Sequence, residues 1–217
     1  MLGKSVKAPS FLTKELIDAK SDINALASDE TTPFSKAAEN GNGILIELLL
    51  KQSNLDVSRS YHEKTTLHIA CEKGHTDVVK ALLADHRCTH YVNMKDSSGK
   101  TPVHIAVEYG RTNILSNLLE KTHDVNAVDK NGCTPLWIAI ENNQEKCVFL
   151  VENGADVNAT EYDGRTPLCL LVKHHGSFAV MRYLIEKGAT LNNERGPLHS
   201  LRNHLFLPTF LIKAFVL

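Results

Sequence analysis

Apolar and polar positions alternate at helical spacing along most of the chain. Paired apolar residues three to four positions apart place one hydrophobic face on a helix. Such pairs recur as Val78-Val79 with Leu82-Leu83, Ile114-Leu115 with Leu118-Leu119, and Val148 with Leu150-Val151. Each of these segments follows a shorter one that carries small residues, at Ala70, Ala106 and Ala139. The pattern predicts pairs of short helices, in which small side chains let neighbouring helices approach closely.

A four-residue motif introduces each predicted helix pair. Its copies begin at Thr32, Thr65, Thr101, Thr134, Thr166 and Gly196, so that successive copies lie 33, 36, 33, 32 and 30 residues apart. Thr is a natural N-cap, and the Pro that follows it in most copies suits the first helical position. A polar turn that ends in Gly precedes the motif, as in Asp-Ser-Ser-Gly and Asp-Lys-Asn-Gly. A near-constant period of this length predicts a repeat architecture.

The combined motif, Asp-x-x-Gly-x-Thr-Pro-Leu-His-x-Ala followed by Gly-Ala-Asp-Val-Asn-Ala, resembles the ankyrin repeat. The resemblance implies an all-α fold, an ankyrin-repeat solenoid of stacked helix-turn-helix units with hairpin-like finger loops. Each unit of such a solenoid is stabilised mainly by its neighbours. We interpret residues 1–217 as a single ankyrin-repeat domain. Its predicted units are a partial N-terminal repeat at 1–26, full repeats at 27–59, 60–95, 96–128, 129–160 and 161–192, and a shortened C-terminal repeat at 193–217.

Two segments depart from the repeat pattern. Residues 86–91 lengthen the connection after the second full repeat and explain the step of 36 residues. We expect this insertion to protrude, either as a specificity element or as a tolerated loop insertion. The segment 205–217 is apolar nearly all round, although a terminal repeat needs a polar outer face. Either the natural chain continues, or this predicted helix contacts a partner, or the exposure is simply tolerated.

Composition narrows the classes of function. The formal net charge is −1, so no bulk positive field recruits nucleic acid. The longest apolar stretch is interrupted by Pro208 and Lys213 and is too short to span a bilayer, so we expect no membrane insertion. The five cysteines show no Cys-x-x-Cys spacing, which favours a reducing compartment and a cytoplasmic or nuclear location.

No motif for catalysis, phosphate binding or metal binding occurs. The chain lacks Gly-x-Ser-x-Gly, a phosphate-binding Gly-rich loop and His-Glu-x-x-His, and its eleven histidines show no ligand spacing. We therefore predict no enzyme activity, no catalytic residue, no metal and no cofactor. The resemblance implies that His68, His104 and His199 bond to the adjacent turn. Trp137 takes the same motif position, where we expect packing, with partner contact as the alternative.

The resemblance implies that a partner protein binds the concave face, made of the finger loops and the first helices. The predicted finger residues are Arg59, Tyr61, His62, Lys64, Lys95, Ser98, Lys100, Lys130, Asn131, Tyr162, Asp163 and Arg165. The predicted first-helix residues are Glu72, Lys73, Glu108, Tyr109, Glu141, Asn142, Lys173 and His174. Glu39, Glu72, Glu108 and Glu141 lie seven residues after their motif threonines, and Lys173 breaks the series. We predict an acidic ladder flanked by basic fingertips; the alternative is an ordinary solvated helix face.

The resemblance also implies that Asn126 and Asn158 are candidate sites of asparaginyl hydroxylation. For the whole chain we predict a non-catalytic protein-protein interaction scaffold or adaptor. The alternatives are a substrate-recognition subunit of a ubiquitin ligase, an NF-kappa-B-type inhibitor, and the cytosolic domain of a larger receptor or channel. The identity of the partner does not follow from the fold.

Overall fold

The computed structural model describes residues 22–59, 63–122, 124–142, 145–174 and 176–191, and these residues form five pairs of α-helices. The first helices of the pairs, called the inner helices, are α2 (Pro33–Glu39), α4 (Thr66–Lys73), α6 (Pro102–Glu108), α8 (Pro135–Asn142) and α10 (Pro167–Lys173). The second, outer helices are α3 (Gly43–Leu50), α5 (Thr76–Ala84), α7 (Thr112–Leu119), α9 (Glu145–Glu152) and α11 (Phe178–Glu186). No strand occurs within these residues, which confirms the predicted all-α solenoid. Residues 1–21, Tyr61, His62, His199 and the segment 205–217 lie outside the described residues.

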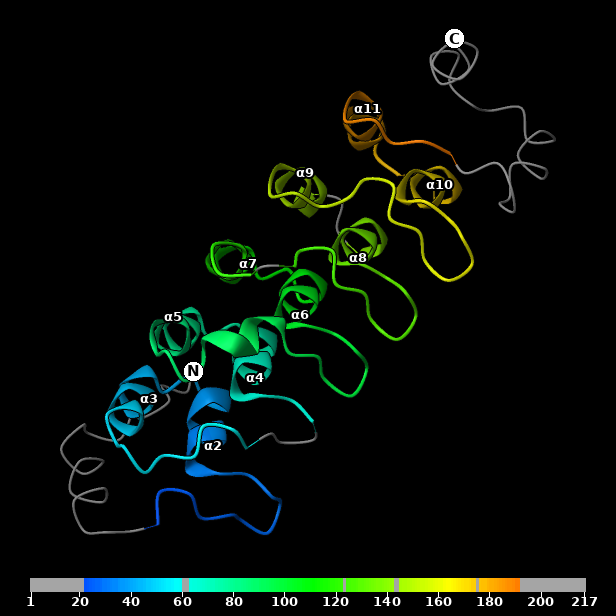
Figure 1. Cartoon of the computed structure of the whole chain (residues 1–217). Helices are drawn as coiled ribbons and strands as arrows, with labels where there is room; N and C mark the ends of the chain where they lie inside the picture. Colours follow the sequence, from blue (N-terminus) through cyan, green and yellow to red (C-terminus); the bar gives the residue numbers. More distant parts are fainter. Residues whose placement is uncertain (1–21, 60–62, 123, 143–144, 175, 192–217) are drawn as a thin grey trace, which may run out of the picture.

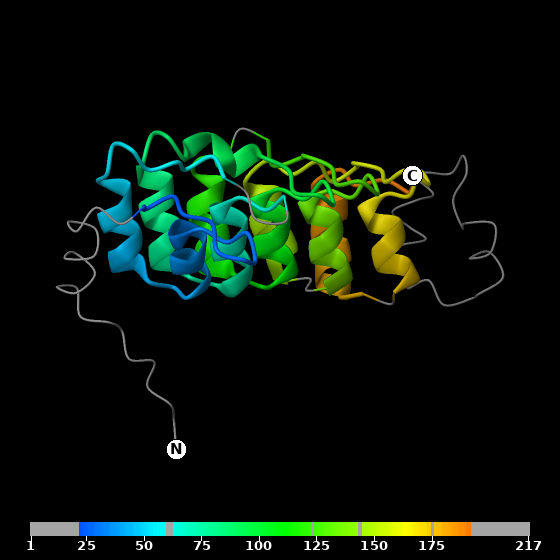
Figure 2. The same cartoon turned by 90° about the horizontal axis from the view of Figure 1, so that it is seen from below.

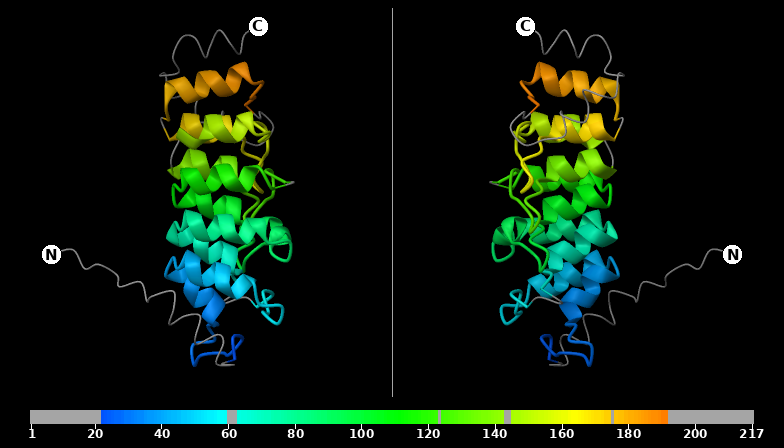
Figure 3. Two further views of the ribbon diagram at one scale, coloured as in Figure 1. Left: turned by 90° about the vertical axis from the view of Figure 1, so that its left-hand side faces the viewer. Right: turned by 90° about the vertical axis from the view of Figure 1, so that its right-hand side faces the viewer.

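The helices form two rows (Figure 1), and each inner helix packs on its counterparts in the neighbouring repeats; in the outer row α3 packs on α5, α5 on α7, and α9 on α11. Viewed from below and from the sides, the pairs stack in one elongated file, and the finger loops leave it along one edge (Figures 2 and 3). The predicted small residues of the inner row, among them Ala70, Ala106 and Ala139, are fully buried between neighbouring helices. The core is therefore continuous along the stack, as nearest-neighbour packing requires.

The motif histidines connect each inner helix to the next repeat. The backbone N–H of Thr101 donates to Nδ1 of His104 at 3.1 Å, so that Nε2 carries the ring proton and donates to the carbonyl of Cys133 at 3.1 Å. His68 repeats the arrangement, with Nε2 at 3.0 Å from the carbonyl of Lys100. Each imidazole thus closes its own helix N-terminus and holds the following finger loop. This agrees with the structural role predicted for these residues.

Burial lowers the pKa of His68 and His104 below the ordinary value of 6.5. The unfolded chain therefore takes up protons first as the pH falls, and the stability provided by the neutral rings, complete above about pH 6.5, is lost below it. We expect the free energy of unfolding in urea to drop between pH 7.5 and pH 5.5. The double variant His68→Gln/His104→Gln should be less stable at pH 7.5 by about 1–3 kcal/mol, because it leaves buried groups unpaired. An equally steep drop in that variant would show that other groups cause the pH dependence.

On the opposite edge of the stack, the side chain of Arg111 contacts the backbone of the preceding repeat at Glu72 and Gly74. The guanidinium of Arg111 donates from Nη2 to the carbonyl of Glu72 at 2.9 Å and lies directly over Gly74. Gly74 has φ of +85°, and a Cβ on it would lie 2.8 Å from Cζ of Arg111. Glycine is therefore required there both for its backbone conformation and for the close approach of the arginine.

We predict that Gly74→Ala costs more stability than Gly110→Ala. Gly110 also has positive φ, +66°, but a Cβ there meets nothing within 4 Å. Both variants should lose about 1–2 kcal/mol from the left-handed backbone, and Gly74→Ala about 1 kcal/mol more, because the bond from Arg111 to Glu72 is displaced. Chemical denaturation of the two variants measures the difference. Equal losses would show that the contact with Arg111 contributes nothing.

The insertion at 86–91 protrudes only in part, because His86, Thr89 and His90 are exposed whereas Arg87, Cys88 and Tyr91 fold back onto the stack. Cys88 and Tyr91 are 0% and 2% exposed, and a 3-10 helix, η1 (Thr89–Asn93), packs on α5 and α6. Arg87 donates to the carbonyl of Gln52 at 3.2 Å and also to that of Leu50, at the end of α3. The hydroxyl of Tyr91 donates to the carbonyl of Val57 at 2.6 Å. The insertion folds back because it satisfies carbonyl groups of the preceding repeat.

Candidate protein-interaction face

The concave face is here the surface formed by the finger loops and the exposed last turns of the inner helices. Its fingers are held by their own acidic residues. Oδ1 of Asp96 accepts the backbone N–H groups of Ser98 and Lys100, each at 2.9 Å, and Asp129 does the same in the next finger. The N–H of Lys130 donates to the carbonyl of Ser98 at 3.0 Å and joins the two fingers. The finger backbones are therefore fixed before any partner arrives.

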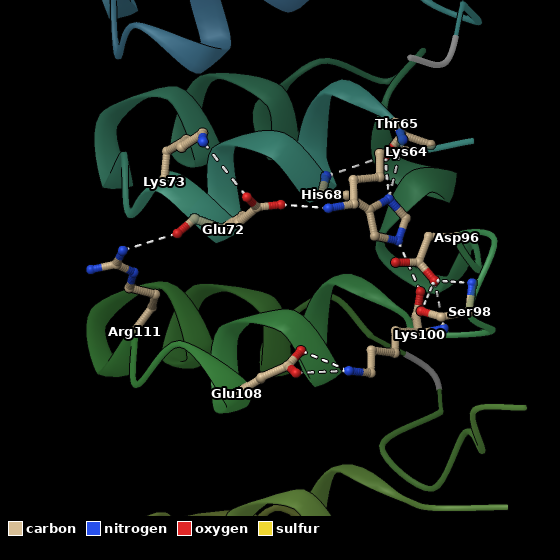
Figure 4. Close-up of polar contacts among 10 residues, drawn as sticks. All are labelled: Lys64, Thr65, His68, Glu72, Lys73, Asp96, Ser98, Lys100, Glu108 and Arg111. Atoms are coloured by element: carbon tan, nitrogen blue, oxygen red, sulfur yellow. Dashed lines mark hydrogen bonds and ion pairs between the residues drawn. The ribbon is translucent and has the colours of Figure 1, made fainter. Parts of the chain in front are cut away.

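Two lysines of the fingers pair with glutamates of the inner helices (Figure 4). Nζ of Lys64 lies 2.6 Å from Oε2 of Glu72, and Nζ of Lys100 lies 2.8 Å and 2.9 Å from the two carboxylate oxygens of Glu108. In both pairs the lysine stands eight residues before the glutamate, so one finger closes on its own helix. The hydrogen bond from Lys64 lowers the pKa of Glu72 and raises that of Lys64. The Lys64–Glu72 pair is therefore ionised at neutral pH.

These pairs change the predicted acidic ladder. Glu72 and Glu108 are neutralised by the basic fingertip residues that the sequence placed in a separate stripe. Glu39 pairs with Lys36 of its own helix, with 2.7 Å between Nζ and Oε2. The first three glutamates of the series therefore form ion pairs and are not free carboxylates. The expectation of two separate stripes of opposite charge is wrong in the repeats of α4 and α6.

The fourth and fifth repeats break this pairing. Cys133 occupies the position of the finger lysine, and Glu141 at the end of α8 is exposed and has no ion pair among the residues that the structure describes. In the fifth repeat Arg165 pairs with Glu161, at 2.7 Å from Nε to Oε1, and with Asp163. Lys173 stands at the glutamate position, and it too is exposed and without an ion pair in the described part of the chain. This half of the face therefore carries charges that form no ion pair within the described part of the chain.

Glu161 lies in the middle of this half. Burial raises its pKa, and the negative charges of Asp163 and Glu141 add to the effect, whereas Arg165 and Lys173 oppose it. Glu161 thus interacts electrostatically with both Glu141 and Lys173. Asp96 and Asp129, at the equivalent position of earlier fingers, instead bond to their own turns. The extra methylene of glutamate directs its carboxylate toward Arg165.

Aromatic side chains also distinguish the concave face. Tyr109, at the end of α6, is 47% exposed, and Tyr162, in the fifth finger, is 74% exposed. A Cβ on Gly132 would lie 2.9 Å from Cδ1 of Tyr162, so the ring leans on the preceding finger. Trp137 is 3% exposed, which confirms the predicted packing role rather than partner contact.

The other predicted finger and helix residues make local contacts or lie open to solvent. Nε of Arg59 lies 3.0 Å from Oδ2 of Asp56, and Nζ of Lys95 donates to the carbonyl of Val128 at 2.7 Å. Nζ of Lys73 lies 3.6 Å from Oε1 of Glu72. The side chains exposed to solvent are those of Lys130, Asn131, Asn142 and His174.

The two asparagines predicted to be hydroxylated connect consecutive repeats. Asn126 donates to the carbonyl of Gly154 at 3.1 Å and accepts the N–H of Asp156 at 2.8 Å. Asn158 makes the same two contacts one repeat later, with Gly188 and Thr190. Sequence analysis missed this role, although the recurrence of Asn at one place in the period could have indicated it. Hydroxylation of either residue stays a prediction.

The described residues include no group of three potential metal ligands. Burial raises the pKa of Cys88, Cys133 and Cys147 to about 12, so these thiols are not activated nucleophiles. None of the described helices is both long and apolar enough to cross a bilayer.

Two comparisons define the class of protein. Family models described as "Ankyrin repeats (3 copies)" match residues 5–94 and 85–161, and a model described as "Ankyrin repeat" matches residues 163–196. The chain therefore belongs to the ankyrin-repeat family, whose members serve as non-catalytic protein-interaction modules. The structure is similar to the crystal structure of the ankyrin repeat domain of Bcl-3, described as a unique member of the IkappaB protein family. The TM-score is 0.75 at 26% sequence identity, over 85% of this chain and 82% of that one.

We predict that Lys100 and Glu108 stabilise the fold as a pair. A double-mutant cycle with Lys100→Ala and Glu108→Ala should give a coupling energy of about 0.3–1 kcal/mol, because both side chains are partly exposed. As a control, Glu141→Ala should change the free energy of unfolding by less than about 0.5 kcal/mol, since it breaks no ion pair. A coupling energy of zero, or a larger loss of unfolding free energy for Glu141→Ala, would contradict the distinction between the paired Glu108 and the unpaired Glu141.

Proposed function

We propose that this chain is a non-catalytic scaffold or adaptor that binds a partner protein through its concave face. The observation that carries the proposal is a set of exposed side chains, Tyr109, Glu141 and Tyr162. Their backbones belong to finger loops and helices whose conformation is held by hydrogen bonds and by packing between repeats. A face fixed in advance loses little conformational entropy on binding. Tyrosine is also among the residue types that contribute most to protein interfaces.

The contrast with the outer row of helices supports the same conclusion. The outer helices expose charged residues such as Glu47, Lys80 and Arg182, and Arg182 pairs with Glu186 one turn away. The apolar side chains of Ile44 and Phe178 are also exposed there, but they lie on the first and the last outer helix, α3 and α11. The concave face combines tyrosines, amides and unpaired charges from several repeats. A polar face of this kind, with aromatic side chains as anchors, resembles protein interfaces in composition.

Site-specific photo-crosslinking in cell extract tests this proposal. A photoreactive amino acid replaces Tyr109 or Asn131 on the concave face, and Glu47 or Lys80 on the outer helices serves as the matched control. We expect the same protein to be crosslinked from both concave positions and from neither control position. Crosslinks from the outer positions alone would contradict binding through the concave face.

The second candidate function is that of an NF-kappa-B-type inhibitor, and the similarity to the Bcl-3 domain favours it. A direct binding measurement between the chain and a purified NF-kappa-B dimer distinguishes this candidate from a general adaptor. We also propose a cytoplasmic or nuclear location, which the five thiols without a disulfide support.

A further inference from the structure

We infer that the partner contributes an extended segment that carries one cationic and one anionic side chain about three residues apart. In this arrangement the cation faces Glu141 at the end of α8, and the anion faces Lys173 at the end of α10. The inference rests on the proposed function, because it specifies the partner of the same concave face. It locates the specificity in the fourth and fifth repeats.

The repeats of this chain provide the template for the cation. In two successive repeats an ammonium group lies within 3 Å of the glutamate at the end of the inner helix, supplied by Lys64 and by Lys100. In the fourth repeat the glutamate is retained as Glu141, but the residue eight positions earlier is Cys133, which carries no cation and ends several bonds short of a lysine ammonium. A lysine or arginine of the partner would restore the pair that the protein forms elsewhere.

The neighbouring finger does not provide a substitute cation. Arg165 stands at the corresponding position of the next finger, but its guanidinium is held by Glu161 and Asp163. Glu141 moreover adds to the negative charge that raises the pKa of Glu161. Arg165 and Lys173 oppose that effect, so the attraction for a cationic side chain comes from the exposed Glu141 carboxylate itself, which has no ion pair among the described residues.

Opposite Lys173, the partner is expected to supply a negatively charged side chain. Lys173 stands where the four earlier repeats carry glutamate, and Arg165 replaces the finger lysine of its repeat. Two cations therefore occupy the positions that hold a lysine–glutamate pair in the second and third repeats. Arg165 is neutralised within its own finger, whereas Lys173 has no ion pair among the described residues. A carboxylate of the partner would complete this position.

The geometry of stacked helices sets the spacing of the two partner charges. Neighbouring packed helices lie about 8–10 Å apart, and α8 packs directly on α10. An extended chain advances about 3.1–3.4 Å per residue, so three residues span about 9–10 Å. Tyr109 on the preceding repeat and Tyr162 in the fifth finger flank this track, and both rings are open to contact.

The test begins with a displayed library of random 12-residue peptides selected on the full chain. We expect the binders to be enriched in a basic and an acidic residue about three positions apart. For the tightest of them, Glu141→Lys and Lys173→Glu should each weaken binding at least tenfold, measured by fluorescence anisotropy. The double variant should instead prefer the same peptide with its two charges exchanged. Both residues are exposed and lie outside the stack contacts, so thermal melts should stay unchanged.

The control is the exchange Lys100→Glu/Glu108→Lys, which retains an ion pair on the same face and should leave affinity within twofold. If Tyr109→Ala weakens binding but Glu141→Lys and Lys173→Glu do not, the concave face binds the peptide and the charge inference is overturned. If none of these variants changes affinity, both the inference and the proposed function fail. A selection that yields no binder dependent on Glu141 also overturns the inference.

Discussion

Contact between consecutive repeats is the constraint on which the rest of this structure depends. A pair of helices of seven to nine residues cannot bury a core alone, so each pair is stable only against its neighbours. The polar connections follow the same rule, because His68 and His104 each bind the finger of the following repeat. Arg111 and Asn126 join loops of adjacent repeats at other places on the stack.

This arrangement separates stability from recognition. The histidines and small residues that hold the stack are buried, whereas the glutamate or lysine side chain in the last turn of each inner helix lies at the surface. In the second and third repeats the chain still uses these turns for a lysine–glutamate pair. In the fourth and fifth repeats the pair is absent, and Glu141 and Lys173 are open to a partner. Cys133 stands where the second and third repeats carry the finger lysine, so Glu141 lacks the partner that Glu72 and Glu108 have.

The sequence was sufficient to predict the fold because each repeat carries its own signals: a Gly turn, a capping Thr, small residues and an apolar second helix. It also placed the candidate face, since position within the repeat determines which side chains point outward. It could not reveal that Lys64 and Glu72 neutralise each other, because pairing over eight residues depends on how the finger folds against the helix. Nor could it show that Arg87 and Tyr91 fold back on carbonyl groups of the preceding repeat.

The most direct test of the account is an NMR titration of the isotopically labelled chain with its selected peptide. The account predicts that amide shift changes concentrate near Tyr109, Glu141, Tyr162 and Lys173, with little change along the outer helices. Shift changes centred on α3, α5, α7 or the 3-10 helix η1, with α8 and α10 unaffected, would contradict it.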